Sequence, residues 1–240
     1  MSQEKVIEVE SGSLLMKFFR EDSSHYLDSL LSGFIHNDTP ERMRLCERNG
    51  VGDTKDSCVM TFRTERDDPT EYSLKLNGHS FDFVNGVKAL TIQNKTAANQ
   101  SWMNCWFAFK LPQNEIDAEL LKGHLAKMKR DFGTRYVVLS NFKLLIERLQ
   151  KNSVKPVKWG YVDYSSSSYD WNLLCKSMDY SYQSEFRFLF GECALHEKEP
   201  YQFQIEEGLH DILHADADIK VHSKDTGKLW LDLLAIKPAE

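Results

Sequence analysis

The sequence predicts an α+β fold, a mostly antiparallel and strongly aromatic sheet with a few flanking helices. Short apolar or alternating runs are many and helical stretches are few, so no regular βαβ succession is expected. Aromatic residues make up 12% of the chain and gather in the run 101–109, as expected of a sheet core. An Asn77-Gly78 step between two such runs is a good hairpin signal. No linker-like stretch interrupts the chain, which predicts one domain over residues 1–240.

The first hundred residues are expected to form mainly strands around one helix. The apolar run 14–19 predicts a buried first strand. Residues 23–32 predict a helix, because apolar side chains recur at helical spacing and Gly33 follows where a helix commonly ends. Pro40 opens a polar, charged loop that extends to residue 56. Further strands are expected at 34–35, 58–63, 72–76, 81–84 and 87–93.

The rest of the chain is expected to contain two helices and several strands. Residues 114–130 give the clearest helical pattern, with one apolar side formed by Ile116, Leu120, Leu121, Leu125 and Met128. A second helix is expected at 142–149, with Asn141 as its N-cap. Strands are expected at 101–109, 136–139, 158–164 and 186–190, and a strand or short helix at 229–236.

The composition excludes several broad classes of protein. With 41% hydrophobic residues and a net charge of −6, the chain is globular, and bulk charge does not favour binding to nucleic acid. No apolar run approaches the roughly 20 residues of a membrane span, and the polar N-terminus does not resemble a signal peptide. The 5 cysteines include no Cys-x-x-Cys pair and are expected to be reduced thiols in the cytoplasm.

Familiar nucleotide and hydrolase motifs are absent from the sequence. There is no G-x-x-x-x-G-K-[ST] phosphate loop, no G-x-G-x-x-G after a strand and no G-x-S-x-G turn. These absences argue against a P-loop ATPase, a kinase, an ordinary Rossmann dehydrogenase and an α/β-hydrolase.

Two other candidate sites have plainer structural explanations. His210 and His214, followed by Asp216, are spaced so that both imidazoles could bind one metal ion. Histidines on a charged surface are the commoner explanation, and no metal is expected. Cys105 lies between Trp102 and Trp106, so we expect a core thiol, the most buried of the cysteines, and not a reactive one.

Two charged segments are less easily explained as surface. Arg20 directly follows the first apolar strand, and the polar loop behind the next strand contains Arg44. In the second segment, alternation places Glu185 and Arg187 on one face of a strand, with two phenylalanines opposite. An exposed ion pair of this kind needs no function, but charged side chains are rare on core strands.

These segments carry a resemblance that spans most of the chain. The sequence resembles a large uncharacterised domain family of bacteria and their phages. The matching motifs, in order, are Phe19-Arg20, Leu30-Leu31-Ser32-Gly33, Gly52-Asp53, Asn104-Cys105-Trp106, a strand and helix over Tyr136 to Leu149, Gly160-Tyr161-Val162-Asp163-Tyr164, Lys176, Tyr182 and Glu185-Phe186-Arg187. The chain departs from the family by having Gln183 where an acidic residue is usual, and by lacking a Trp-x-x-Tyr motif after the Cys-Trp strand.

The layout is also similar, at the level of the fold, to ADP-ribosyltransferases. In those enzymes a late glutamate binds the nicotinamide ribose of NAD and stabilises an oxocarbenium-like transition state. The resemblance implies that Glu185 has this role and that Arg187 orients it. It also implies that NAD is held by Arg20 and Arg44 at the pyrophosphate, by Tyr182 stacked on the nicotinamide, and by Tyr26 and Lys176.

The leading hypothesis is therefore an NAD-binding, ADP-ribosyltransferase-like or NAD-cleaving protein of a bacterial toxin or defence system or of phage host takeover. Its partner would be a host or bacterial protein, met in the host cytoplasm if a phage encodes the chain. The alternative is a non-catalytic interaction protein, such as a phage-encoded inhibitor, because Trp and Tyr dominate interface hot spots. A metal-dependent nuclease around His210, His214 and Asp216 is a weaker alternative.

Overall fold

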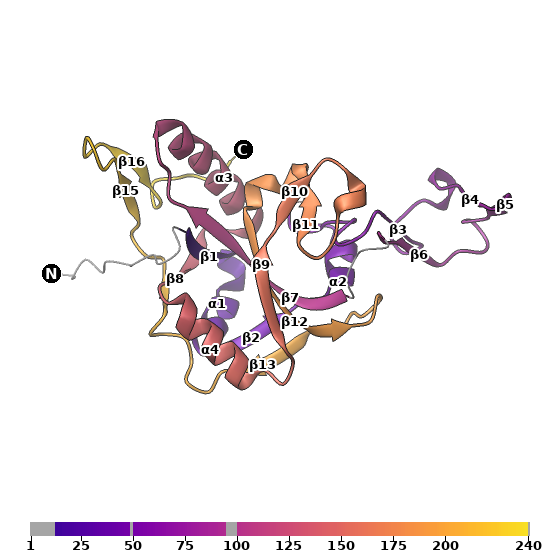
Figure 1. Ribbon diagram of the computed structural model, residues 1–240, viewed down its shortest axis with the longest axis horizontal. Coiled ribbons are helices and arrows are strands. Elements are labelled where there is room, and N and C mark those ends of the chain that lie inside the picture. Colours follow the sequence, from indigo (N-terminus) through magenta and orange to yellow (C-terminus); the bar gives the residue numbers. More distant parts are fainter. Residues whose placement is uncertain (1–12, 49, 95–99, 240) are drawn as a thin grey trace.

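A six-stranded antiparallel sheet forms the centre of the protein (Figure 1). The computed structural model describes residues 13–48, 50–94 and 100–239. In spatial order the strands are β14 (Leu213–Ala215), β8 (Arg135–Leu139), β1 (Ser13–Phe19), β7 (Gln100–Lys110), β12 (Glu185–Cys193) and β9 (Val157–Tyr161). β1, the first strand among the described residues, therefore lies inside the sheet.

Four α-helices accompany the sheet in the described part of the chain: α1 (Ser24–Leu31), α2 (Pro40–Leu45), α3 (Glu115–Phe132) and α4 (Phe142–Asn152). The remaining strands form two-stranded ladders. These are β2 (Phe34–Asn37) with β13 (Tyr201–Gln204), β3 (Met60–Arg63) with β6 (Ala89–Ile92), β4 (Leu74–Leu76) with β5 (His79–Phe81), β10 (Asp163–Ser165) with β11 (Cys175–Ser177), and β15 (Lys220–His222) with β16 (Leu229–Asp232).

The two faces of the sheet are covered by different helices. Phe186, Phe188 and Phe190 of β12 join the core cluster that contains the buried side chains of α1 and α4. Leu125 of α3 packs in a second cluster with residues of β1, β7 and β8 on the opposite face. Because side chains alternate along a strand, Glu185 and Arg187 point to the α3 face. The predicted division of this strand between phenylalanines and charges is thus confirmed.

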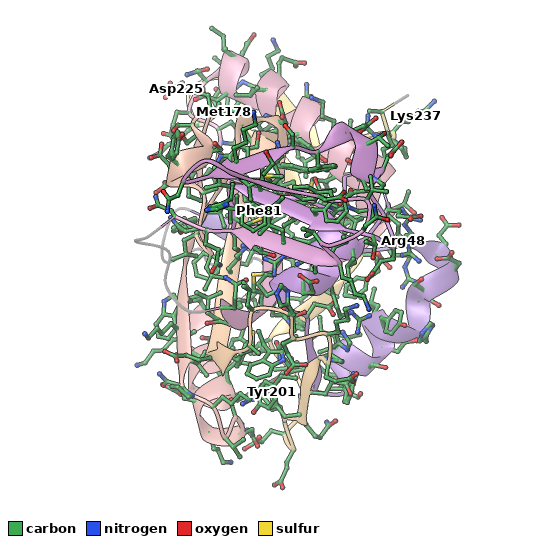
Figure 2. The ribbon with its side chains drawn as sticks, turned by 90° about the vertical axis from the view of Figure 1, so that its right-hand side faces the viewer. Arg48, Phe81, Met178, Tyr201, Asp225 and Lys237 are labelled. Carbon is green, nitrogen blue, oxygen red and sulfur yellow. The ribbon has the colours of Figure 1, made fainter. Side chains whose placement is uncertain are left out.

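The segment 59–94 forms an arm that extends away from the sheet. It carries the β3–β6 ladder and, at its end, the β4–β5 hairpin, which turns at Asn77-Gly78 as predicted (Figure 1). In Figure 2 the arm faces the viewer, with Phe81 labelled in front of the body. A buried ion pair between Arg63 Nε and Glu41 Oε1, 2.7 Å long, ties the arm to α2.

The predicted α+β class is confirmed, while three local expectations are wrong in whole or in part. The strand expected at 81–84 lies earlier, because β5 covers His79–Phe81 and residues 83–86 form a turn. Residues 40–45 form helix α2 and not a loop, because Thr39 accepts a hydrogen bond from Arg42 N and Pro40 suits the first helical position. Ile116 and Leu120 of α3 are 81% and 61% exposed. The predicted positions Leu121, Leu125 and Met128 are buried, together with Ala118, so the apolar side of α3 is confirmed except at its first two residues. No helix in the described part of the chain is long and apolar enough to cross a bilayer.

The end of α1 offers a test of the packing beside β2. Gly33 has φ +95°, and an added Cβ would lie 2.3 Å from Ile205 O. We expect Gly33→Ala to lower the free energy of unfolding by about 2 kcal/mol or more. Gly123, inside α3, has no atom within 4 Å of such a Cβ, so Gly123→Ala should raise it by about 0.5–1 kcal/mol. Urea unfolding of both variants measures the two free energies of unfolding. Equal effects would contradict the conclusion that a Cβ has no room at Gly33 but has room at Gly123.

Candidate functional site

A cavity of about 160 Å³ lies on the α3 face, where β1 and β7 diverge. β1 pairs with β7 only as far as Met16, although it continues to pair with β8 as far as Phe19. Apolar walls come from the sheet and from helices α2 and α3, with Met16, Phe18, Met43, Phe107, Met128 and Phe132. The charged side chains in the lining are Lys17, Asp56, Lys176, Glu185 and Arg187.

Lys17 bridges the divergence between the two strands. On this edge of β7, Phe107 pairs with Met16 of β1 and Met103 pairs with Asp38, which leaves Cys105 between them without a strand partner on that edge among the described residues. Lys17 Nζ donates to Cys105 O and to Asn104 Oδ1, each at 3.0 Å. Burial lowers the pKa of Lys17, an effect that Cys105, Asp38 and Glu185 only partly offset. The ammonium thus replaces a missing ladder hydrogen bond.

Arg187 is the centre of a buried ion cluster at the cavity. Its Nη2 lies 2.8 Å from Asp56 Oδ2, and its Nε lies 2.7 Å from Glu185 Oε1. The guanidinium also donates to Leu173 O at 2.8 Å. Lys176 Nζ is 3.2 Å from Glu185 Oε2 and 3.9 Å from Asp53 Oδ2. These side chains come from β12, from β11 and from the loop after α2.

The cluster holds one carboxylate more than it has cations. Its ion pairs join three carboxylates, Asp53, Asp56 and Glu185, to two cations, Lys176 and Arg187. Burial favours the neutral acids, but the charges of Arg187 and Lys176 outweigh it and hold the pKa of both Glu185 and Asp56 below the usual range. Burial and the neighbouring Asp56 raise the pKa of Asp53. Of the three carboxylates, Asp53 is therefore the one whose ionisation destabilises the fold.

The structure brings three of the predicted site residues together at the cavity, namely Glu185, Arg187 and Lys176. Arg20 and Tyr182 meet beside it at Asp131 of α3. Arg20 Nη2 donates to Asp131 O at 3.0 Å, and the Tyr182 hydroxyl donates to Asp131 Oδ2 at 2.6 Å. Neither of the two is part of the cavity lining.

The other two predicted residues lie elsewhere. Arg44 is fully buried, and its guanidinium donates to Glu41, Gln100, Asp56 O and Leu195 O. It therefore acts as a cross-link between α2, β7 and the loop after β12. Tyr26 is 57% exposed on α1, beside His25. Arg44 and Arg187 do share an anionic residue, but it is Asp56 of the same chain.

Lys17, Asp53 and Asp56 were not among the predicted site residues. A signal for Lys17 exists, because it interrupts the otherwise apolar run of β1 and charged side chains are rare there. Asp53 and Asp56 lie in the charged loop after α2, where sequence alone does not show which acidic residue turns inward. Gln183, which replaces an acidic residue of the family pattern, accepts from Lys176 Nζ at 3.0 Å and donates to Gly50 O at 2.6 Å.

His210, His214 and Asp216 do not form a group that could hold a metal ion. His214 Nε2 lies 3.0 Å from Ser140 Oγ, while Asp216 binds Arg135 Nε and the Tyr136 amide. In the described residues, no group of three or more His, Cys, Asp or Glu side chains could hold a metal ion.

Cys105 lines the cavity but is not the most buried cysteine, contrary to the prediction. Cys58 and Cys175 are more buried, because the divergence of β1 from β7 leaves Cys105 beside the cavity. Burial and the charge of Glu185 raise the pKa of the Cys105 thiol well above its usual range. The thiol is therefore protonated at neutral pH and a poor nucleophile, as expected.

The opposite pKa shifts of the two aspartates give a test of the cluster. Asp56, with a lowered pKa, stabilises the fold above about pH 4, and this stability is lost as the pH falls. Asp53, with a raised pKa, contributes stability below about pH 4 that is lost as the pH rises. At pH 7 we expect Asp56→Asn to cost about 3–5 kcal/mol and Asp53→Asn to be neutral or stabilising.

Urea unfolding of the wild type and both variants at about pH 3 and at pH 7, on either side of the ordinary aspartate pKa, measures these effects. Asp211→Asn is the control, because Asp211 pairs with Arg148 at the surface and such a pair contributes up to about 1 kcal/mol. Equal losses from Asp53→Asn and Asp56→Asn would show that the excess charge is not located at Asp53.

Comparisons with known proteins identify no relative of this chain. No protein-family model matches the chain, and neither a curated protein nor a solved structure matches it. The resemblances indicated by the sequence motifs therefore stay predictions.

Proposed function

We propose that the cavity binds the nicotinamide end of NAD and that the protein transfers or hydrolyses ADP-ribose. The observation that carries this proposal is Glu185, an ionised carboxylate held by Arg187 and Lys176 in the lining of an otherwise mainly apolar cavity. A fixed carboxylate beside a bound ribose would stabilise positive charge that develops when the bond to nicotinamide breaks.

The size of the cavity supports an aromatic ring and not a whole dinucleotide. An apolar protein cavity of about 150 Å³ holds benzene, and this cavity measures about 160 Å³. Pockets that enclose a drug-sized ligand measure about 300–1,000 Å³. Only the nicotinamide and part of its ribose would therefore be enclosed, and the adenosine half of NAD would lie outside.

The lining also offers partners of the right type for this fragment. Phe18, Phe107 and Phe132 contribute apolar side chains that suit a planar ring. The Cys105 main chain faces the divergence of the strands, and its N–H is a donor that a carboxamide oxygen could accept from. Oε2 of Glu185 already accepts hydrogen bonds from Lys176 Nζ and Arg187 Nη2, whereas Oε1 accepts one from Arg187 Nε. A carboxylate oxygen has two lone pairs, so Oε1 is the oxygen that would face the ribose.

The atoms of the proposed reaction balance without a metal or a redox partner. The bond between the ribose C1′ and the nicotinamide nitrogen breaks, and neutral nicotinamide leaves. A water molecule or a nucleophilic group of an acceptor protein forms the new bond to C1′ and loses a proton. Glu185 supports the charge on the ribose, and Arg187 and Lys176 hold Glu185 in place.

A non-catalytic interaction protein is the second candidate. The observation in its favour is that Trp159 and Tyr161, both on β9, are 40% and 46% exposed, and such side chains commonly anchor protein interfaces. On this alternative the cavity is only structural, and Glu185→Gln would leave the capture of a partner unchanged.

Titration calorimetry with NAD, followed by measurement of released nicotinamide, tests the leading proposal. We expect the wild type to bind NAD, and Glu185→Gln to release nicotinamide about 100-fold more slowly or not at all. Because this variant loses the ion pairs of Glu185 with Arg187 and Lys176, its urea unfolding is measured alongside, and nicotinamide release is compared for folded protein only.

Glu192→Gln is the matched control, since Glu192 lies on the same strand and is exposed. It should bind and cleave NAD like the wild type. Absence of binding by the wild type at millimolar NAD would rule the proposal out. Equal nicotinamide release by Glu185→Gln would remove Glu185 from the reaction.

A further inference from the structure

The outer edge of β9 is open for hydrogen bonding. β9 is the last strand of the sheet and pairs with β12 along one side only. In the part of the chain that the structure describes, no strand pairs with its other side. The strand at the opposite edge of the sheet, β14, has only three residues, whereas β9 is five residues long and pairs without a bulge. A strand of this length presents alternate N–H and C=O groups to any extended chain beside it.

Aromatic side chains cover one face of this edge. Trp159 and Tyr161 alternate along β9 and so project on the same side of the sheet. Their inner sides pack against Phe142 and Phe186, with ring centroids 6.2 and 5.0 Å apart. The rings are therefore held in place by the core, yet keep 40% and 46% of their surface exposed.

The chain around this edge is basic, although the protein has a net charge of −6. Between residues 142 and 161 one acidic residue, Glu147, accompanies Lys143, Arg148, Lys151, Lys155 and Lys158. Arg148 and Lys151 are neutralised by Asp211 and Glu207. Lys158 lies exposed on β9 itself, and Lys110 Nζ lies 5.7 Å from the centroid of the Tyr161 ring. Two acidic residues lie nearby. Asp163 comes just after the end of β9, and Glu192 lies within the paired strand β12.

We propose that β9 is a docking edge for an extended, acidic peptide segment of another protein, which adds a strand to the sheet. Main-chain hydrogen bonds would supply the pairing, apolar side chains of the peptide would rest on Trp159 and Tyr161, and acidic side chains would face Lys158. The charge selects this occupant over a second copy of the chain. Two β9 edges would bring their Lys158 side chains onto one face, where like charges repel.

This inference does not depend on the NAD proposal. Trp159 and Tyr161 project on the α4 side of the sheet, where Tyr161 packs on Phe186, whereas the cavity lies on the α3 side. A docking edge would serve an enzyme that modifies a protein as well as a protein that only binds one. Peptide binding and NAD binding can therefore fail separately.

Fluorescence anisotropy with a labelled peptide of alternating Glu and Val tests the docking edge. We expect saturable binding that weakens as salt is added, and much weaker binding of the alternating Lys and Val peptide. Lys158→Glu should weaken binding about tenfold, and Trp159→Ala should weaken it as well. Lys224→Glu is the control, since Lys224 is exposed in the turn between β15 and β16, beside Asp225, which Figure 2 labels.

Methylated peptides test the strand pairing itself without altering the protein. Only alternate N–H groups of an added strand face β9. N-methylation of one alternate set should abolish binding, while methylation of the other set should leave it nearly unchanged. Loss of binding with both sets, or with neither, would exclude strand addition.

The remaining outcomes would overturn the choice of partner. Equal binding of the Glu and Lys peptides, or no binding of the Glu peptide by the wild type at millimolar concentration, would reject an acidic peptide. A wild-type dimer in sedimentation analysis that Trp159→Ala dissociates would instead assign the edge to a second copy. Displacement of the Glu peptide by a single-stranded RNA oligomer would assign it to nucleic acid.

Discussion

The structure depends on neutralising one buried cation, the guanidinium of Arg187. This side chain is 1% exposed on an inner strand of the sheet, and an unpaired charge at such a depth would cost several kcal/mol. Asp56 and Glu185 supply the counter-charges. Asp56 does so from a loop that precedes β12 by some 130 residues of chain, so the loop after α2 must cover the α3 face of the sheet. The second arginine, Arg44, binds the main chain of the same Asp56 and fixes the loop from its other side.

The cavity follows from this arrangement. The loop can approach the sheet only as far as its ion pairs allow, and below it β1 turns away from β7, so the sheet itself does not fill the space. Lys17 closes the divergence with an ammonium group that binds neutral acceptors. Charged and apolar side chains thus line one cavity, where burial strengthens a further charge or hydrogen bond relative to the surface.

Local features of the sequence predicted local structure well, and distant pairing lay beyond them. The Asn77-Gly78 turn, the cap at Asn141 and the helix end at Gly33 depend on a few adjacent residues, and each is present. Alternation along residues 185–188 predicted the shared face of Glu185 and Arg187 for the same reason. The partner of Arg187 could not be predicted, because Asp53, Asp56 and other acidic residues of the loop differ only in how the loop folds. The burial of Arg44 could not be predicted either, because most of its acceptors come from residues far away in the sequence. Thr39-Pro40 is a typical start of a helix, but the polar character of the residues that follow favoured a loop.

The place of β1 in the sheet has a consequence for how the protein acquires its fold. β1 comes first among the described strands, yet its two neighbours, β7 and β8, come from residues beyond 100. On the ribosome this apolar strand would therefore wait with both edges open until β7 is made, and with one edge open until β8 follows. Such long-range pairing slows folding and leaves intermediates prone to aggregation. The strand that lies beside the cavity in the folded protein is thus exposed to aggregation through its open edges during synthesis.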